Sequence, residues 1–132
     1  MKDWEWLFPI DRIEIVKTTC LGDVIFIDSE GILQILDVVA GEVRIYDLKE
    51  EEQVNNMPNL IARLESQGLK LKEGQCYGLK PHAIFKEYVA ENVYVASLSE
   101  YVSWAGDFHR QIKDVPDGGK IRIEVLNWKT IQ

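Results

Sequence analysis

The spacing of the apolar residues changes partway along the chain, and this change limits the folds that the chain can adopt. Up to residue 46 short apolar segments are separated by turn residues, and in the last of them Val43 and Ile45 alternate with Arg44 and Tyr46, which is typical of a strand with one buried face. Beyond residue 47 the apolar residues recur every three or four positions, which is the period of an amphipathic helix. Strands followed by helices predict an α+β fold, with a mainly antiparallel sheet and helices packed on one face, in preference to a doubly wound sheet.

Turn residues divide the first half of the chain into expected strands. The sequence Asp-Ser-Glu-Gly at 28–31 favours a hairpin turn, and Ala-Gly-Glu at 40–42 favours a second one. The strands expected around these turns are 12–16, 24–27, 32–38 and 43–46.

Helix start and stop signals follow the strands. Asp47, with Glu50 three residues later, has the spacing of a capping box and predicts that a helix starts near Leu48. Pro58 suits a first helical position and Gly68 suits a helix stop. A second, short amphipathic helix is therefore predicted over 58–67.

The last third of the chain predicts a strand, the longest helix and a final strand. Residues 93–97 have the composition of a strand, and Ser97 has the spacing of an N-cap for a helix over 98–112. Breakers at 115–119 end this helix, and residues 121–125 alternate as a strand.

The composition favours one folded domain over 1–132, because a chain of 132 residues can bury roughly two thirds of the surface that it exposes when unfolded. The net charge of −7 argues against nucleic acid as a partner, because affinity for phosphate backbones comes from clustered Lys and Arg. A basic partner fits this charge better.

The N-terminal stretch lacks the features of a targeting signal. It is acidic where a secretory signal is basic, and no apolar run in the chain is long enough to span a bilayer. We therefore expect a cytoplasmic protein without a membrane partner. Trp4, Trp6 and Phe8 crowd this end, and such aromatic residues usually fasten a terminus onto the core.

The residues able to do chemistry are few. Cys76 and His82 could in principle form a nucleophile and its base, but the sequence fixes no third group to orient the histidine. Cys20, Cys76, His82 and His109 show none of the spacings of a zinc site. We expect both cysteines to be reduced strand residues that pack as small hydrophobes, and both histidines to lie at the surface or at an edge. No catalytic residue, metal site or cofactor is expected.

Three segments carry a resemblance to a known family. They are 20–28 (CLGDVIFID), 73–81 (EGQCYGLKP), and 97–99 (SLS) followed by 111–118 (QIKDVPDG). In this order they resemble the C-terminal domain of type VI secretion immunity proteins that neutralise a DNase effector. The residues of this chain that match the family signature are Gly22, Asp23, Cys76, Tyr77, Gly78, Lys80 and Pro81.

The resemblance implies a bacterial protein that binds and inhibits a toxic effector, with no catalytic residues of its own. Relatives often carry an additional N-terminal domain, for which 132 residues leave no room, so a stand-alone version of the domain is expected. The competing hypothesis is a small ligand-binding domain or enzyme with a pocket near Tyr77, Lys80 and His82.

The densest acidic cluster is the expected partner-binding surface. It consists of Asp47, Glu50, Glu51 and Glu52, and its carboxylates would face the basic groove in which a DNase holds phosphates. Capping the helix needs only Asp47 and Glu50. Glu51 and Glu52 are therefore the residues that we expect to contact the toxin.

Overall fold

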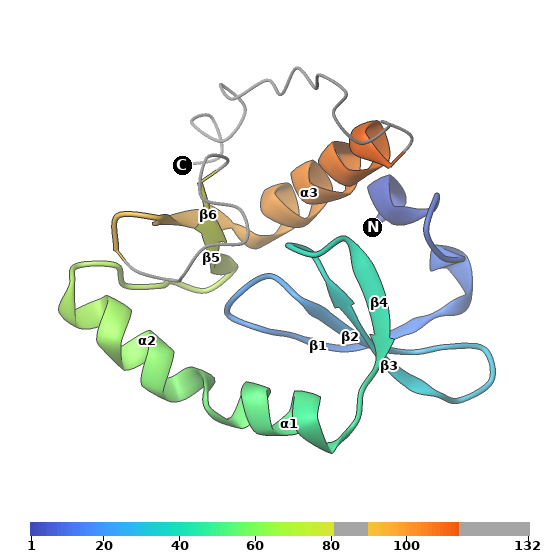
Figure 1. Cartoon of the computed structure of the whole chain (residues 1–132), viewed down its shortest axis with the longest axis horizontal. Helices are drawn as coiled ribbons and strands as arrows, with labels where there is room; N and C mark the ends of the chain where they lie inside the picture. Colours follow the sequence, from blue (N-terminus) through green and yellow to red (C-terminus); the bar gives the residue numbers. More distant parts are fainter. Residues whose placement is uncertain (81–89, 114–132) are drawn as a thin grey trace.

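The computed structural model describes residues 1–80 and 90–113, and these residues have an α+β fold with antiparallel strands, as predicted (Figure 1). The strands form a four-stranded sheet in the order β1-β2-β3-β4 and a two-stranded sheet of β5 and β6. The strands are β1 (Glu14–Thr18), β2 (Val24–Ile27), β3 (Leu33–Asp37), β4 (Glu42–Ile45), β5 (Gln75–Leu79) and β6 (Val93–Ser97). The helices are α1 (Leu48–Asn55), α2 (Met57–Ser66) and α3 (Leu98–Ile112), and two 3-10 turns, η1 (Lys2–Trp4) and η2 (Ile10–Arg12), precede them.

The predicted elements within the described residues are all present, with ends that move by at most two residues. The first strand begins at Glu14, two residues later than expected, and α2 covers 57–66 where 58–67 was predicted. The predicted breakers at 115–119 and the predicted strand at 121–125 lie outside the described residues.

One face of the four-stranded sheet packs against the N-terminal segment and α3. Val24 pairs with Leu36 across β2 and β3, and both side chains belong to a core cluster that also contains Trp4 of η1 and Tyr101 of α3. On the same face the ring of Phe8 stacks on Phe26, with ring centroids 5.0 Å apart. The N-terminal aromatic residues therefore close the core, as predicted.

The indole groups of the first turn fasten the N-terminus to α3. Trp4 is fully buried, and its Nε1–H donates to the carbonyl of Val102 at 2.8 Å. Trp6 donates in the same way to the carbonyl of Gly106 at 3.2 Å. A Cβ at Gly106 would lie only 2.7 Å from the carbonyl oxygen of Asp3, so the glycine allows this close approach.

The opposite face of the four-stranded sheet looks toward α1. Ile35 of β3 pairs with Arg44 of β4, and both residues border a pocket that α1 also lines with Glu50 and Val54. Figure 1 shows α1 and α2 on one side of this sheet and α3 on the other. The three helices are thus divided between the two sides of the sheet, and the expectation that they all pack on one face needs correction, because α3 covers the face that carries Val24 and Leu36.

A second, smaller core lies between α2 and the two-stranded sheet. Leu64 of α2, Tyr77 and Leu79 of β5, and Val93 of β6 form it. Gly68, whose φ is +91°, follows the end of α2 as the predicted stop residue.

The end of α2 is closed by two backbone hydrogen bonds. The N–H of Gly68 donates to the carbonyl of Glu65, and the N–H of Leu69 donates to that of Leu64, both at 3.0 Å. This is the pattern of a Schellman cap. Because Leu69 also packs against the second core, the cap joins α2 to the two-stranded sheet.

Candidate functional site

The N-terminus of α1 is capped by Asp47, as the sequence predicted. The Asp47 carboxylate accepts a hydrogen bond from the backbone N–H of Glu50 at 3.0 Å. The Glu50 side chain, however, is engaged elsewhere: its Oε1 accepts from Arg44 Nε at 2.6 Å. The predicted capping box is therefore replaced by an ion pair to the sheet.

Arg44 joins three acidic side chains from three parts of the fold. Its Nη1 lies 2.9 Å from Asp37 Oδ2 on β3 and 2.7 Å from Glu42 Oε1 on β4, and its Nε binds Glu50 on α1. Hydrogen bonding to Glu50, followed by that to Glu42 and Asp37, raises the pKa of the guanidinium. This network holds the start of α1 against the sheet.

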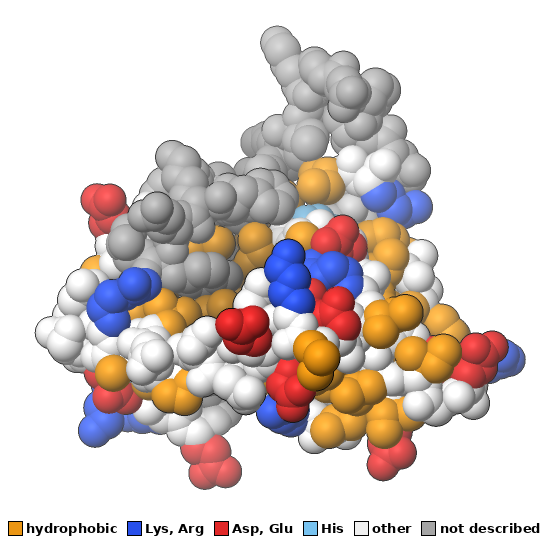
Figure 2. All heavy atoms as spheres, turned by 60° about the horizontal axis from the view of Figure 1, so that its bottom comes forward, with side chains coloured by type: hydrophobic (Ala, Val, Ile, Leu, Met, Phe, Trp, Pro, Cys, Tyr) orange, Lys and Arg blue, Asp and Glu red, His pale blue; other side chains and the backbone are white. Residues whose placement is uncertain are grey.

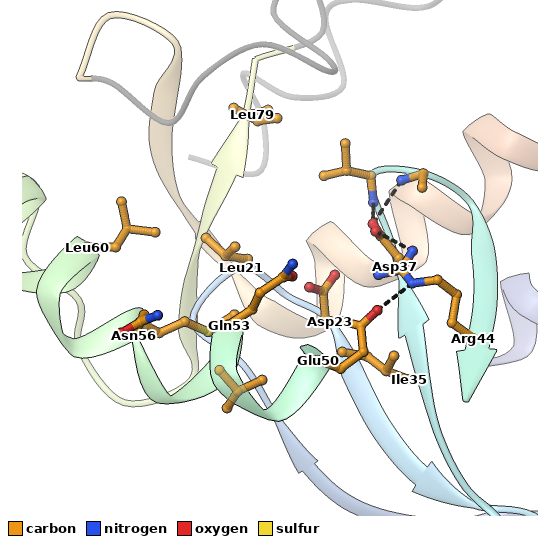
Figure 3. Close-up of a pocket in the computed structure, with 14 residues that line it drawn as sticks. Leu21, Asp23, Ile35, Asp37, Arg44, Glu50, Gln53, Asn56, Leu60 and Leu79 are labelled. Carbon is orange, nitrogen blue, oxygen red and sulfur yellow. Dashed lines mark hydrogen bonds and ion pairs between the residues drawn. The ribbon is translucent and has the colours of Figure 1, made fainter. Parts of the chain in front are cut away.

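A pocket of about 490 Å³ lies next to this network, between the sheet, α1, α2 and the end of β5 (Figure 3). One part of its wall is apolar, and this part includes Leu21, Ile35, Leu60 and Leu79. The polar part includes Asp23, Asp37, Arg44, Glu50, Gln53 and Asn56. Three carboxylates and one guanidinium thus share a pocket that has room for a small organic group.

Asp23 lies in the interior of this pocket. Its Oδ1 accepts a hydrogen bond from the backbone N–H of Val38 at 3.1 Å. Burial of the carboxyl, together with the nearby charge of Asp37, raises the pKa of Asp23 to about 7. Asp23 is therefore poised to gain or lose a proton near neutral pH.

The two sides of α1 carry different residues. Glu50, Gln53 and Val54 follow the three-and-four spacing of one helical face, and all three line the pocket together with Met57 at the start of α2. Leu48, Glu51 and Glu52 have the same spacing on the other side and are exposed. We call these last three residues the outer face of α1.

The outer face of α1 combines an apolar residue with two carboxylates. Leu48 is 82% exposed, and Ile45 at the end of β4 is 64% exposed. Among the described residues, neither Glu51 nor Glu52 has an ion-pair partner. Figure 2 shows hydrophobic and acidic side chains next to one another on the side of the molecule that carries α1.

The structure therefore separates the four acidic residues predicted to bind a partner. Asp47 caps the helix and Glu50 pairs with Arg44, so both have structural roles. Glu51 and Glu52 are exposed on the outer face, and their role in partner binding stays a prediction.

The signature residues of β5 serve packing. Cys76 and Tyr77 are fully buried, and the Tyr77 hydroxyl donates to the carbonyl of Leu69 at 2.6 Å. A Cβ at Gly78 would lie 2.7 Å from Cε1 of Tyr101, so only glycine leaves room for that ring. Gly22 has a φ of +85° and also borders Tyr101.

The alternative pocket expected near Tyr77, Lys80 and His82 stays a prediction, because only two of its three residues are described. Tyr77 is buried in the second core, and the backbone N–H of Lys80 donates to the carbonyl of Asn92 at 2.9 Å. His82 and Pro81 lie outside the described residues. The pocket beside Asp23 shares only the neighbouring Leu79 with that strand.

Two expectations about cysteine and histidine need correction. Cys20 lies in the turn between β1 and β2, not in a strand, although both cysteines are free as expected. His109 is only 6% exposed, not at the surface. Its Nε2 lies 3.1 Å from the Val38 carbonyl and 3.0 Å from that of Val39, which satisfies the imidazole in the interior.

Neither cysteine has the surroundings of a reactive thiol. Burial raises the pKa of Cys20 to about 11 and that of Cys76 to about 12, so both remain protonated at neutral pH. Within 1–80 and 90–113, no group of three or more His, Cys, Asp or Glu side chains could hold a metal ion. No helix among these residues is long and apolar enough to cross a bilayer.

The sequence did not predict that Asp23, Asp37, Arg44 and Glu50 would come together. Asp23 was identified only as part of a signature, and Glu50 only as a capping residue and a member of the acidic cluster. The signal that was available is the strand alternation that puts Asp37 and Arg44 on the same face as Ile35, one face of the β3–β4 hairpin.

Comparisons of the chain with family models, with curated proteins and with solved structures find no match.

Proposed function

We propose that this chain is an immunity-type protein that binds a basic toxic enzyme, such as a nuclease, and inhibits it by covering its substrate groove. The observation that carries the proposal is the outer face of α1, where the 82% exposed side chain of Leu48 stands beside the carboxylates of Glu51 and Glu52. The resemblance of the signature segments to immunity proteins of type VI secretion supports the same function.

An exposed leucine next to two carboxylates suits a protein partner. Burying the Leu48 side chain against an apolar pocket would contribute about 1.5–3 kcal/mol to binding. Glu51 and Glu52 would sit at the rim, where charge contributes more to the rate and specificity of encounter than to affinity.

The partner is expected to be basic because of the charge of the whole chain as well. A net charge of −7 produces a field that speeds the approach of a positively charged protein. The groove of a nuclease contains Lys and Arg side chains that hold the phosphates of its substrate. Two carboxylates on one helix face would bind to these Lys and Arg side chains in place of phosphates. Binding would take place in the cytoplasm, where the substrate of such an enzyme is found.

Co-expression tests this proposal. The product of the gene next to the one for this chain is expressed in a bacterial host, alone and together with the chain. We expect growth to stop when the neighbour is expressed alone and to resume when the wild-type chain is present. A non-toxic neighbour, or toxicity that the chain does not relieve, would contradict the proposal.

Variants locate the surface in the same assay. Leu48→Asp, and the double reversal of Glu51 and Glu52 to Lys, are expected to lose protection. The matched control reverses Glu14 and Glu30, two exposed residues of β1 and the β2–β3 turn, and keeps protection with the same change in charge. Equal protection by all variants would place the binding surface elsewhere.

A further inference from the structure

The pocket beside Asp23 is independent of the outer face of α1. It opens on the other side of that helix, and its volume of about 490 Å³ falls within the range of sites for small organic ligands. The pocket contains both an apolar wall and a charged wall (Figure 3). A ligand that fits must therefore have an apolar part and a polar part.

The charges of the pocket do not balance. Asp23, Asp37 and Glu50 line it together with one cation, Arg44. Arg44 is already paired with Asp37 and Glu50, and also with Glu42. No described cation is left to pair with Asp23, so the site favours a positive group and repels an anion.

The carboxyl group of Asp23 has one oxygen to spare. Its Oδ1 accepts from the N–H of Val38, whereas no described residue donates to Oδ2. The side chain of Asp23 is half-buried, and in Figure 3 it lies between those of Gln53 and Asp37. The second oxygen, Oδ2, is therefore free to accept a hydrogen bond from a ligand N–H.

An organic cation fits these features better than a metal ion. No group of described carboxylates has the arrangement to hold a metal, and metal ions gain nothing from the apolar wall formed by Leu21, Leu60 and Leu79. An alkyl chain that packs against this wall gains the free energy of burying its apolar surface.

We propose that this pocket binds an organic cation, an alkylammonium or alkylguanidinium group, with its charged end against Asp23 and its apolar stem along Leu21, Leu60 and Leu79. The group can belong to a free small amine or to a Lys or Arg side chain of a protein partner. The chemistry of recognition is the same for both sources, because each presents N–H donors on a short hydrocarbon chain.

The protonation of Asp23 makes binding depend on pH. The titratable and charged groups around it are the carboxylates of Asp37 and Glu50, the guanidinium of Arg44, and the neutral side chains of Cys20, Cys76 and Tyr101. Because the pKa of Asp23 is about 7, the carboxylate form that a cation needs becomes populated as pH rises from 6 to 8. Affinity is expected to rise over the same interval.

The test is a titration of the full chain with butylguanidinium, followed by NMR of the methyl groups of Leu21, Leu60 and Leu79. Butylurea, which has nearly the same shape but no charge, is the control ligand. We expect saturable shifts of these methyl groups with butylguanidinium, tighter binding at pH 8 than at pH 6, and no saturation with butylurea. Equal binding of the two ligands, or no saturable shift with butylguanidinium, would overturn the proposal.

Variants connect the binding to Asp23. Asp23→Asn keeps an acceptor for the Val38 N–H but removes the charge. The affinity for butylguanidinium should fall at least tenfold and should no longer depend on pH. Asp11→Asn, a change at an exposed position, should bind as the wild type does. Unchanged affinity in Asp23→Asn would contradict the proposal.

A second variant covers the case in which Asp23→Asn does not fold. Gln53 is exposed and lines the pocket, so Gln53→Lys places a tethered ammonium next to Asp23. This variant should exclude butylguanidinium, and undiminished binding would count against the site.

The source of the cation is distinguished with the toxic neighbour protein. If a partner side chain is the natural ligand, butylguanidinium will compete with that protein and Asp23→Asn will weaken the complex. If a free amine is the ligand, neither butylguanidinium nor Asp23→Asn will affect the complex with the toxic neighbour protein. Either result supports the site, and neither depends on whether the outer face of α1 binds the partner.

Discussion

His109 of α3 occupies the space that a side chain at Gly41 would need. Gly41 lies in the turn between β3 and β4 with a φ of +71°, and a Cβ built there would collide with the imidazole ring. The ring is 6% exposed, and its Nε2 is within hydrogen-bond distance of the carbonyls of Val38 and Val39. The contact fastens the end of α3 to the β3–β4 turn.

Replacing this glycine tests the contact. Gly41→Ala is expected to lower the free energy of unfolding by about 2 kcal/mol more than Gly31→Ala, because overpacking is added to the backbone strain. Gly31 is the matched control: its φ is +79°, and nothing lies within 4 Å of a Cβ built there. Urea denaturation of both variants makes the comparison, and equal losses would show that His109 does not hold the turn.

The raised pKa of Asp23 predicts how stability depends on pH. The pKa of this carboxyl is near 3.9 in the unfolded chain and about 7 in the folded protein, so the folded state keeps the proton up to a higher pH. The folded state therefore loses stability relative to the unfolded state as pH rises from about 4 to 7. Asp23→Asn, which cannot ionise, should not show this loss.

The measurement is the difference in unfolding free energy between Asp23→Asn and the wild type at several pH values. Between pH 5 and 7, we expect the unfolding free energy of the variant to rise by about 2 kcal/mol relative to that of the wild type. A single ionising group can contribute at most about 1.4 kcal/mol per pH unit, and the expected value is lower than this limit because Asp23 keeps partial exposure to solvent. A difference that does not change with pH would show that Asp23 ionises as it does in the unfolded chain.

His109 acts in the opposite direction and is present in both proteins. Burial lowers the pKa of its imidazole, so its neutral form is favoured in the folded state and stability is lost as pH falls below about 6.5. Taking the difference between variant and wild type removes this effect.

Much of the fold could be predicted from the sequence because the signals are local. Turn residues on either side located β2, apolar alternation located β4, and Pro58 and Gly68 marked the two ends of α2. Asp47 was correctly identified as a cap because its acceptor reaches a backbone N–H only three residues away.

The candidate site could not be predicted in the same way because its contacts are long-range. Asp23 accepts a hydrogen bond from Val38, fifteen residues away, and Arg44 pairs with Glu50 only because α1 packs beside the sheet. The burial of His109 depends on a contact some seventy residues away in sequence. A period of two or of 3.6 residues carries no information about such pairs.

Cys76 tests whether the signature residues of β5 serve packing. Its side chain is fully buried, so Cys76→Ala should lower the free energy of unfolding by about 1 kcal/mol or somewhat more. The native thiol, with a pKa of about 12, should react with a thiol reagent only after the chain unfolds. Rapid labelling of the native protein, or loss of partner binding in a variant with unchanged melting temperature, would instead indicate a functional thiol.

The outer face of α1 is the central claim, and the rate of association with the toxic partner tests it most directly. The rate constant is measured by stopped flow at increasing salt for the wild type, for the chain with Glu51 and Glu52 reversed to Lys, and for the control with Glu14 and Glu30 reversed. At low salt the first double variant should associate at least tenfold more slowly than the control, and the two should converge near 1 M salt, where the Debye length is about 3 Å. Equal rates for the two double variants at low ionic strength would contradict the claim and place the binding surface away from α1.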